Sequence, residues 1–342
     1  MDIMRAAVLT EIGKYPEVSN ITVPKPELGQ VTVRVLVSGL CGSQLQEIYG
    51  HKGNAKFLPH MLGHEGCGIV TEIGEGVSTV KPGDKVVMHW RVGSGIESIF
   101  PEYVLHGNGE RIRFQSGKVT TLAEQVNVSE NRLTVVPDDT DPEFAALLGC
   151  GMTTAFGVIN NEIDLKYGES VAVIGCGGVG LNVIMASVLF GAGRTIGIDS
   201  NPYKRLLAAN LGAGFYSRLP DDQQFDIIID TTGNVDVISD AITHLAGGGR
   251  LVLVGQPVPG RSIEIPNAVS LFDGSGKTIK ATQGGQTNPA LDIPRYASMY
   301  LAGLLGSTDG VVTHRFRLDD IDEAFDTLEY GNAGRVMIRM DG

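Results

Sequence analysis

The sequence is poor in cysteine, with four among 342 residues and no Cys-x-x-Cys pair. It also lacks a basic flank beside an apolar core near its N-terminus, which is the pattern of a secretory signal. A chain of this length buries enough surface to fold without disulfides. We therefore expect a cytoplasmic protein whose cysteines stay reduced and serve as buried residues or metal ligands.

The sequence also has fewer basic than acidic residues. Lys and Arg total 27 against 39 Asp and Glu, which gives a formal net charge of −12. Nucleic acids and anionic membrane surfaces attract basic patches, so the charge balance argues against both partners. A hydrophobic fraction of 42% with 19% charged residues is typical of a folded globular chain. The length allows about two domains of ~150 residues each.

One stretch, between Glu169 and Arg194, has no charged residue and is long enough to span a bilayer. It holds six glycines, four of which lie between positions 175 and 180. A short apolar run, a glycine cluster and a second apolar run are typical of a buried strand, a turn and a buried helix. The sequence therefore predicts no membrane-spanning segment.

The hydrophobic pattern changes along the chain. Before about residue 141 it is β-rich: every second residue from Val31 to Val37 is valine, with mostly polar residues between, which is the period of a strand. After that point apolar runs are separated by helical lengths, which is typical of a parallel sheet covered by helices. The buried parallel strands are predicted at 170–175, 195–199, 226–230 and 250–255.

A helix is predicted near the C-terminus. Its apolar residues recur at helical spacing, at Ile321, Ala324, Phe325 and Leu328. Asp319 and Asp320 open this helix, and Gly331 suits the position just past its end.

The apolar run Val171–Ile174 leads into Gly175-Cys-Gly177-Gly-Val-Gly180. In this G-x-G-x-x-G pattern the first glycine makes a tight turn, the second lets the backbone approach a pyrophosphate, and the third lets the helix pack closely on the strand. The helix N-terminus then offers free N–H groups to the diphosphate. The next strand ends in Asp199, 19 residues after Gly180, close to the ~20 expected for a ribose-binding acid. A dinucleotide-binding loop is therefore predicted.

Asp199 also bears on the choice between NAD and NADP. A carboxylate accepts hydrogen bonds from a 2′-hydroxyl and repels a 2′-phosphate, so the sequence predicts NAD. Two alternatives stay open, because Asp199 also suits the N-cap of the next helix and because Lys204 and Arg205 would accommodate a phosphate.

Three residues far apart in the sequence, Cys41, His64 and Cys150, are each flanked by glycine. Two thiolates and an imidazole suit tetrahedral zinc, and three protein ligands leave the open position of a catalytic site. Spacing alone does not bring them together, and each taken singly is more often a core residue.

Taken together and in order, these segments resemble those of the zinc-dependent medium-chain alcohol and polyol dehydrogenases over nearly the whole chain. The segments that carry the resemblance are Cys41-Gly-Ser43, Gly63-His64-Glu65, Gly83-Asp84-Lys85-Val86, the Cys150 turn and the Gly175–Gly180 loop. The resemblance implies an α/β fold with a GroES-like, β-rich catalytic domain of residues 1–151, completed by 285–342. Residues 152–284 would form a Rossmann NAD-binding domain with a doubly wound parallel sheet.

The resemblance also implies catalytic roles. Cys41, His64 and Cys150 would bind zinc, with Glu65 as a nearby carboxylate that approaches the metal during ligand exchange. Ser43 would be the hydroxyl that takes the substrate proton.

The implied cofactor contacts begin at Thr154, on the nicotinamide side. Gly175, Gly177, Gly178, Val179 and Gly180 would form the diphosphate loop, and the further contacts would be Asp199, Lys204, Val254 and the diphosphate-binding Arg335. Trp90 falls where the family lines its substrate pocket, and an ordinary core position explains it equally well.

Three departures from the family pattern bear on the site. Residues 91–117 contain no cysteine, so the four-cysteine lobe of a structural zinc is missing and one zinc per subunit is predicted. Gln44 stands where the family has an acidic residue that steadies a zinc ligand, and loss of such a partner weakens metal binding by ~10–100-fold. Gln46 replaces the histidine that ends the proton relay in some members, with Glu47 or His51 as alternatives.

The sequence therefore predicts an oxidoreductase that transfers a hydride between a secondary alcohol and NAD, with zinc as Lewis acid. The polar stretch 89–91 favours a polyol, sugar or cyclitol substrate. The alternatives are a zinc-free NADP-dependent enone or quinone reductase and a non-catalytic NAD-binding protein on the same fold. By resemblance we expect a homodimer, with a homotetramer as the alternative, paired through edge elements at 251–255 and 262–265.

Overall fold

The computed structural model describes residues 3–107, 109–305 and 308–340, and the chain divides into two units. The first comprises Met1–Cys150, Asn288–Thr308 and Val312–Gly342, and the second Gly151–Thr287 and Asp309–Val311. The sequence predicted boundaries at 151/152 and 284/285, and it did not predict that 309–311 would belong with the second unit.

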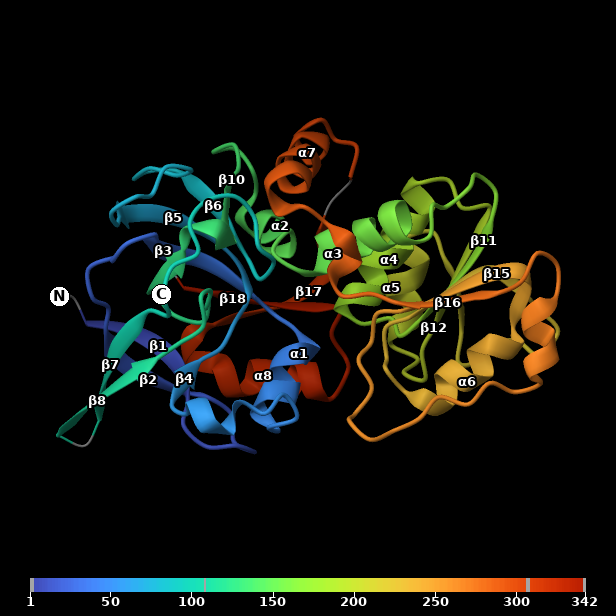
Figure 1. Ribbon diagram of the computed structural model, residues 1–342, viewed down its shortest axis with the longest axis horizontal. Coiled ribbons are helices and arrows are strands. Elements are labelled where there is room, and N and C mark those ends of the chain that lie inside the picture. The colour runs from blue at the N-terminus through green and yellow to red at the C-terminus, as the bar shows by residue number, and fades with distance from the viewer. Residues whose placement is uncertain (1–2, 108, 306–307, 341–342) are drawn as a thin grey trace. The chain divides into compact units, whose positions relative to one another are not determined.

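The described part of the first unit contains two sheets. The smaller has the order β4-β1-β2-β7-β8, with β1 Ile3–Leu9, β2 Glu17–Thr22, β4 His60–Met61, β7 Glu102–Gly107 and β8 Glu110–Gln115. The larger has the order β10-β6-β5-β3-β18-β17, with β9 also paired to β3. Its strands are β3 Gln30–Leu40, β5 Glu65–Ile73, β6 Lys85–His89, β9 Gln125–Ser129, β10 Leu133–Val135, β17 Val312–Arg317 and β18 Arg335–Arg339. In Figure 1 the C-terminal β18 (red) runs beside the N-terminal β3 (blue), so the end of the chain completes a sheet begun near its start.

The described helices of the first unit have 6 to 13 residues. They are α1 Gly42–Ile48, α2 Pro142–Leu147, α7 Pro289–Leu301 and α8 Ile321–Glu329, with 3-10 turns at Asn54–Phe57, Glu130–Arg132 and Leu318–Asp320. Helix α8 confirms the prediction for the C-terminal region. Its apolar positions Ile321, Ala324 and Phe325 are buried, and Gly331, just after the C-cap, has the left-handed φ of 71°.

Strand β3 confirms the predicted period-two strand but not its polar face. Thr32 and Ser38 are buried, because other side chains cover this face of the strand: Ser38 Oγ lies 2.7 Å from Thr121 Oγ1. Thr32 satisfies its hydroxyl by donating to Asn127 Oδ1 at 2.8 Å. Of the predicted alternating positions only Arg34 is exposed.

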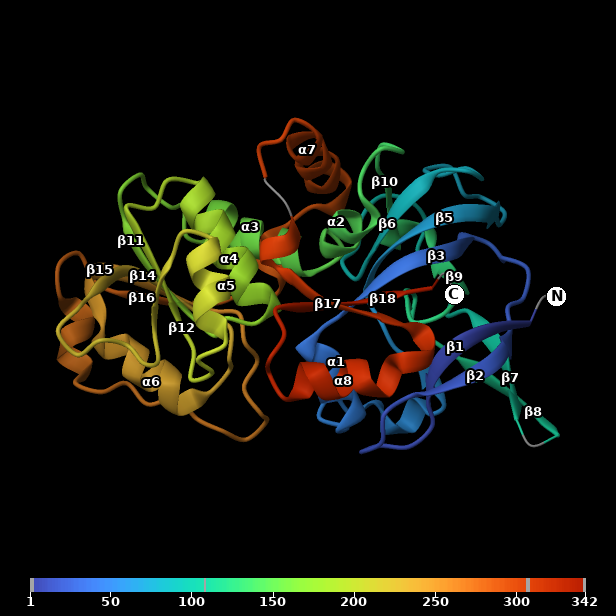
Figure 2. The same cartoon turned by 180° about the vertical axis from the view of Figure 1, so that it is seen from behind.

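The second unit is built on a six-stranded parallel sheet of order β13-β12-β11-β14-β15-β16. The strands are β11 Ser170–Ile174, β12 Arg194–Ile198, β13 Gly214–Tyr216, β14 Phe225–Asp230, β15 Leu245–Leu253 and β16 Thr278–Ala281. The helices are α3 Gly151–Gly157, α4 Gly178–Leu189, α5 Lys204–Asn210 and α6 Val235–Thr243. A π-helix covers Val158–Glu162, and 3-10 turns cover Ala268–Phe272 and Gly284–Gln286. The 3-10 turn Thr308–Gly310 begins in the first unit and ends in the second. Figures 1 and 2 show α4 and α5 on one face of the sheet and α6 on the other, the doubly wound arrangement that was predicted.

The edge of this sheet differs from the prediction. Residues 251–253 belong to β15, which pairs with both β14 and β16 and is therefore internal. Residues 262–265 are not in a strand. The edge strand on this side is β16, because the chain returns to the sheet after residue 277 and adds a sixth strand in parallel.

The uncharged stretch after Glu169 forms β11, the glycine-rich loop and α4, as predicted. Helix α4 has 12 residues. Across the residues that the structure describes, no helix is long and apolar enough to cross a membrane.

A buried carboxylate organises the segment that lacks the cysteines of a structural zinc lobe. Glu130 is 0% exposed. Its Oε1 accepts hydrogen bonds from the backbone N–H groups of Ser78 and Thr79, both at 2.7 Å, and its Oε2 accepts from Ile96 N at 2.7 Å. Burial by itself raises the pKa of Glu130, but these hydrogen bonds outweigh it and hold the pKa below its usual range.

Glu130→Gln is expected to destabilise the first unit by about 2–3 kcal/mol. The amide places an NH2 donor opposite the Ile96 N–H donor, so this hydrogen bond is lost. Urea unfolding followed by the fluorescence of Trp90, the one tryptophan of the chain, measures this. The folded-state pKa of Glu130 is lowered. Its contribution to the free energy of unfolding is therefore complete above the unfolded-state pKa of about 4.3 and is lost as the pH falls through the folded-state pKa.

The control is Glu102→Gln, which removes one partner of an exposed 3.2 Å pair with Arg113. It is expected to change stability by less than about 1 kcal/mol. Equal effects of the two substitutions would show that Glu130 does not hold the segment.

Candidate metal centre and dinucleotide-binding loop

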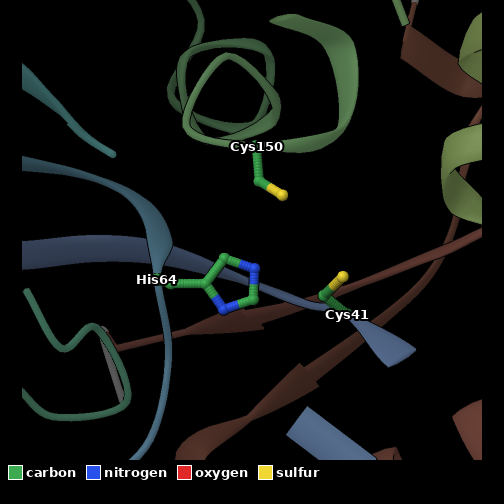
Figure 3. Close-up of side chains that lie close together, drawn as sticks. All are labelled: Cys41, His64 and Cys150. Atoms are coloured by element: carbon green, nitrogen blue, oxygen red, sulfur yellow. The ribbon is translucent and has the colours of Figure 1, made fainter. Parts of the chain in front are cut away.

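Three side chains of the first unit converge on one point (Figure 3). Cys41 follows β3 and is the N-cap of α1, His64 directly precedes β5, and Cys150 follows α2. Their ligand atoms, the two Sγ atoms and a ring nitrogen, all lie within 4.8 Å of one another. The three predicted ligands therefore meet in space, as binding of one metal ion requires.

Glycines beside the ligands allow the backbone to pack this closely. Gly63 has a left-handed φ of +98°, and a Cβ there would lie 2.2 Å from Thr121 Oγ1. A Cβ at Gly149 would lie 2.4 Å from the Met88 carbonyl oxygen. Gly63 and Gly149 thus have a steric cause, since a larger residue would displace His64 or Cys150, whereas a Cβ at Gly42, beside Cys41, would meet nothing within 4 Å.

Gln44 supports Cys41 through the backbone. Its side chain is buried, and its Oε1 accepts a hydrogen bond from Cys41 N at 2.7 Å. Among the described residues, Gln44 Nε2 has no hydrogen-bond partner. The amide that replaces the family's acidic residue therefore still fixes the backbone of one ligand, and its effect on zinc affinity stays a prediction.

The chemistry of the donor set fits a divalent cation. A hydrogen bond from Cys150 lowers the pKa of Cys41 well below its ordinary value, and His64 adds to the effect. The hydrogen bond with Cys41 raises the pKa of Cys150 well above its ordinary value, because the first thiolate opposes ionisation of the second. A divalent cation between the sulfurs would favour both thiolates, and two thiolates with an imidazole are the donors that zinc prefers.

A buried ion pair lies beside the cysteines. Glu65 is 0% exposed and accepts a hydrogen bond from Arg335 Nη2 at 3.2 Å, while Arg335 Nη1 donates to the Leu40 carbonyl at 3.1 Å. Burial alone lowers the pKa of Arg335, but the charges of Glu65 and the cysteines raise it above its ordinary value. The Glu65 carboxylate is not in the group of three ligand atoms, so the metal role of Glu65 and the diphosphate role of Arg335 stay predictions.

Ser43 lies in the first turn of α1, two residues after Cys41, and is partly exposed. In the same segment Gln46 Oε1 lies 2.8 Å from His51 Nδ1. Glu47 instead pairs with Lys52 Nζ at 3.2 Å. Of the two alternatives for the end of the proton relay, His51 is therefore the one linked to Gln46.

His89 does not have the role that the sequence suggested. It is 1% exposed, its Nδ1 bonds to the Arg91 carbonyl at 2.8 Å and its Nε2 to Thr134 Oγ1 at 2.9 Å. Burial lowers its pKa to about 4, so it stays neutral and structural. The His89 side chain therefore does not make a substrate pocket polar, contrary to the prediction for the stretch 89–91. Trp90 is partly exposed, with the Arg91 guanidinium 5.4 Å from its ring centroid.

In the second unit the three glycines of the motif have three different surroundings. Gly175 has a φ of +88°, which makes the tight turn after β11. A Cβ at Gly180 would lie 1.7 Å from the Gly175 carbonyl oxygen, so this glycine lets α4 pack on the turn. Gly177, the N-cap of α4, would place a Cβ with no neighbour within 4 Å. Together with Gly178 and Val179 at the start of α4, this open backbone is what a diphosphate would approach.

Asp199 follows β12 and is tied to the loop. Its Oδ2 accepts a hydrogen bond from Cys176 N at 2.8 Å and its Oδ1 accepts from Asn201 N at 2.9 Å. The N-cap of α5 is Tyr203, so the alternative that Asp199 caps this helix was wrong. Lys204 is 3% exposed, and burial lowers its pKa although the nearby Asp199 carboxylate opposes the shift.

The remaining predicted cofactor residues lie at the ends of elements. Thr154 is buried in α3, and Val254 follows β15, where its N–H donates to the Asp230 carbonyl at 2.8 Å. Asp230 was not predicted as a site residue, but its side chain is buried and accepts hydrogen bonds from Thr232 Oγ1 at 2.6 Å and Gly233 N at 2.9 Å. The signal was present, because Asp230 ends a predicted strand at the carboxyl edge of the sheet.

Comparisons with known proteins agree with this geometry. Residues 27–138 match the alcohol dehydrogenase GroES-like domain and residues 178–294 match the zinc-binding dehydrogenase domain. The chain is 31% identical to an S-(hydroxymethyl)glutathione dehydrogenase of Escherichia coli, over 98% of this chain and 99% of that protein. It resembles the crystal structure of 2R,3R-butanediol dehydrogenase from Bacillus subtilis, with 27% identity, a TM-score of 0.78 and coverage of 99% and 100%. Benzyl alcohol dehydrogenase from Acinetobacter calcoaceticus, at 23% identity, a TM-score of 0.87 and full coverage of both chains, shares the fold.

Proposed function

Since this chain belongs to the zinc-dependent medium-chain dehydrogenase family, we propose that it oxidises a secondary alcohol of polyol, sugar or cyclitol type reversibly to a ketone, with NAD as hydride acceptor. The observation that carries the proposal is the convergence of Cys41, His64 and Cys150 within 4.8 Å. A zinc-dependent dehydrogenase needs both a metal site of this kind and a dinucleotide-binding domain, and the family carries both on one polypeptide.

Cys41, His64 and Cys150 would hold one zinc ion. When bound, zinc would supply Lewis-acid chemistry that favours loss of the alcohol proton. The Ser43 hydroxyl would accept the alcohol proton. Ser43 lies two residues from Cys41 and is partly exposed, and both features are compatible with this role. The Arg335 guanidinium, which donates to Glu65, lies near Cys41, and its positive charge favours the thiolate that a metal requires.

Asp199 supports NAD rather than NADP. Both of its carboxylate oxygens accept backbone hydrogen bonds, which fixes a negative charge at the end of β12. That charge would repel a 2′-phosphate and accept hydrogen bonds from a 2′-hydroxyl.

Two observations support the polyol assignment. Arg91 keeps this stretch polar, with its guanidinium 5.4 Å from the centroid of the Trp90 ring. The 2R,3R-butanediol dehydrogenase of Bacillus subtilis, whose name specifies a vicinal diol with secondary hydroxyls, is 27% identical. S-(hydroxymethyl)glutathione, named in the E. coli relative, belongs in the same substrate panel.

The test is a kcat/KM panel with NAD and NADP. We expect the highest values with NAD and a polyol, cyclitol or vicinal diol, exceeding ethanol by at least about tenfold. Strong preference for ethanol, for long-chain alcohols or for S-(hydroxymethyl)glutathione would overturn the substrate class. NADPH-dependent reduction of enones would favour the reductase alternative, and NAD binding without turnover would favour the non-catalytic one.

We also propose that two subunits form a homodimer, with a homotetramer as the alternative. Among the described strands, β16 forms one edge of the parallel sheet. An edge-to-edge pairing of two subunits on this side would therefore run along Thr278–Ala281, and the molar mass in solution distinguishes monomer, dimer and tetramer.

A further inference from the structure

A one-turn π-helix, Val158–Glu162, directly follows α3 in the second unit. Such turns are rare and occur frequently at functional sites. The last two side chains of this turn, Asn161 and Glu162, both reach the Gly284–Gln286 turn more than a hundred residues later. Neither side chain has a part in the chemistry proposed above.

Glu162 is a buried carboxylate with three donors. Its side chain is 1% exposed and pairs with Lys280 Nζ. It accepts hydrogen bonds from Thr282 Oγ1 at 2.5 Å and Gln286 Nε2 at 3.1 Å. Burial by itself raises the pKa of Glu162, but Lys280 and the hydrogen bonds outweigh it, so the pKa lies below its ordinary value. The charged carboxylate therefore holds the side chains of Lys280, Thr282 and Gln286, and with them the segment 280–286, in place.

The turn Gly284–Gln286 within this segment has an unusual backbone conformation. Gly284, Gly285 and Gln286 have successive φ angles of 77°, 64° and 51°, all left-handed. This conformation is unfavourable for a non-glycine residue, so Gln286 needs support from its surroundings. Asn161 Nδ2 provides it by donating to the carbonyl oxygens of Gly285 at 3.1 Å and Gln286 at 3.4 Å, while Glu162 holds the Gln286 side chain.

The turn is seated directly on α3. A Cβ at Gly157 would lie 2.3 Å from the Gly285 carbonyl oxygen, and a Cβ at Gly285 would lie 2.6 Å from the Thr154 carbonyl oxygen. The two backbones are therefore in contact at the helix turn that carries Thr154. A shift of the Gly284–Gln286 turn would be transmitted to this position.

The place of the turn in the sheet indicates which part of the cofactor it faces. Strand β16 ends at Ala281, so the turn lies beyond the carboxyl ends of the parallel strands. In a doubly wound sheet the two halves each receive one mononucleotide at that edge. Asp199 belongs to the half formed by β11, β12 and β13, and the turn belongs to the half formed by β14, β15 and β16. With the adenosine ribose at Asp199, the second half receives the nicotinamide nucleotide.

We propose that Glu162 is a positioning residue that fixes the Gly284–Gln286 turn against α3 and thereby shapes the site for the nicotinamide half of the cofactor. This inference rests on the proposed NAD-dependent function. It predicts that loss of the Glu162 charge weakens binding of a ligand that contains nicotinamide and leaves binding of the adenosine half unchanged.

The experiment compares NADH with ADP-ribose, which lacks the nicotinamide ring. Glu162→Gln is expected to raise the Kd for NADH roughly tenfold, because a charged acceptor of three donors is lost. The Kd for ADP-ribose should stay within about twofold. Calorimetry measures both, and KM for NAD should rise in parallel with the Kd for NADH.

The matched control is Glu169→Gln, which removes another carboxylate of the second unit that binds a cation, Arg250 at 2.6 Å, at the start of β11. It should change neither Kd. If Glu162→Gln does not fold, Lys280→Met tests the same contact from the more exposed partner, with the same selectivity for NADH and a smaller effect.

Equal weakening of NADH and ADP-ribose, or no change of either, would overturn the role of Glu162. A wild-type protein that binds neither ligand would contradict the proposed function itself. The two failures are therefore distinguishable.

Discussion

Cys41→Ala is expected to lose zinc and alcohol oxidation together, whereas the wild-type protein should carry about one zinc per subunit. Cys41 is one of three donors that lie within 4.8 Å of one another. Groups that only support a ligand contribute ~10–100-fold to metal affinity, so loss of a ligand should reduce affinity by more than that. Elemental analysis of protein purified without added metal or chelator measures the content.

Cys67→Ala is the matched control. Cys67 is also buried in the first unit, and burial raises the pKa of its thiol to about 12, but it lies in β5 outside the group of ligand atoms. This variant should retain zinc and activity. A wild-type protein that holds no zinc even after incubation with the metal would contradict the site and favour the reductase or the non-catalytic alternative. Two zinc ions per subunit would mean that a second set of ligands exists.

Ser43→Ala should lower kcat by about 10²–10⁴-fold, the range for a lost general acid or base. The Kd for NADH should not change, because the substitution removes one hydroxyl from the first turn of α1 and leaves the second unit intact. Pre-steady-state hydride transfer and NADH titration measure the two quantities.

Ser43→Thr keeps the hydroxyl and should retain most of the activity, which separates loss of the proton acceptor from disturbance of Cys41. Near-normal turnover of Ser43→Ala would remove Ser43 from the proton relay. A loss in both variants together with loss of zinc would point to a structural role in the metal centre.

The features that depend on local pattern were predictable from the sequence alone. Four of the six parallel strands, β11, β12, β14 and β15, follow from their apolar runs and helix α8 from its hydrophobic period, whereas β13 and β16 were not predicted. The loop at Gly175–Gly180 follows from three glycines with separate steric roles. The metal ligands were predictable as a set because their residue types and their order along the chain match a known family, although spacing did not bring them together.

The pairing of distant groups depends on the tertiary structure. Glu65 and Arg335 are separated by 270 residues and meet because β5, which begins at Glu65, and β18, which begins at Arg335, both pair with β3. His89 became structural rather than part of a pocket because its neighbours satisfied both ring nitrogens. A sequence shows which side chains carry charge or hydrogen-bonding groups, but burial and partner choice depend on strand order and backbone contacts between distant segments, and these set the pKa and the role of each group.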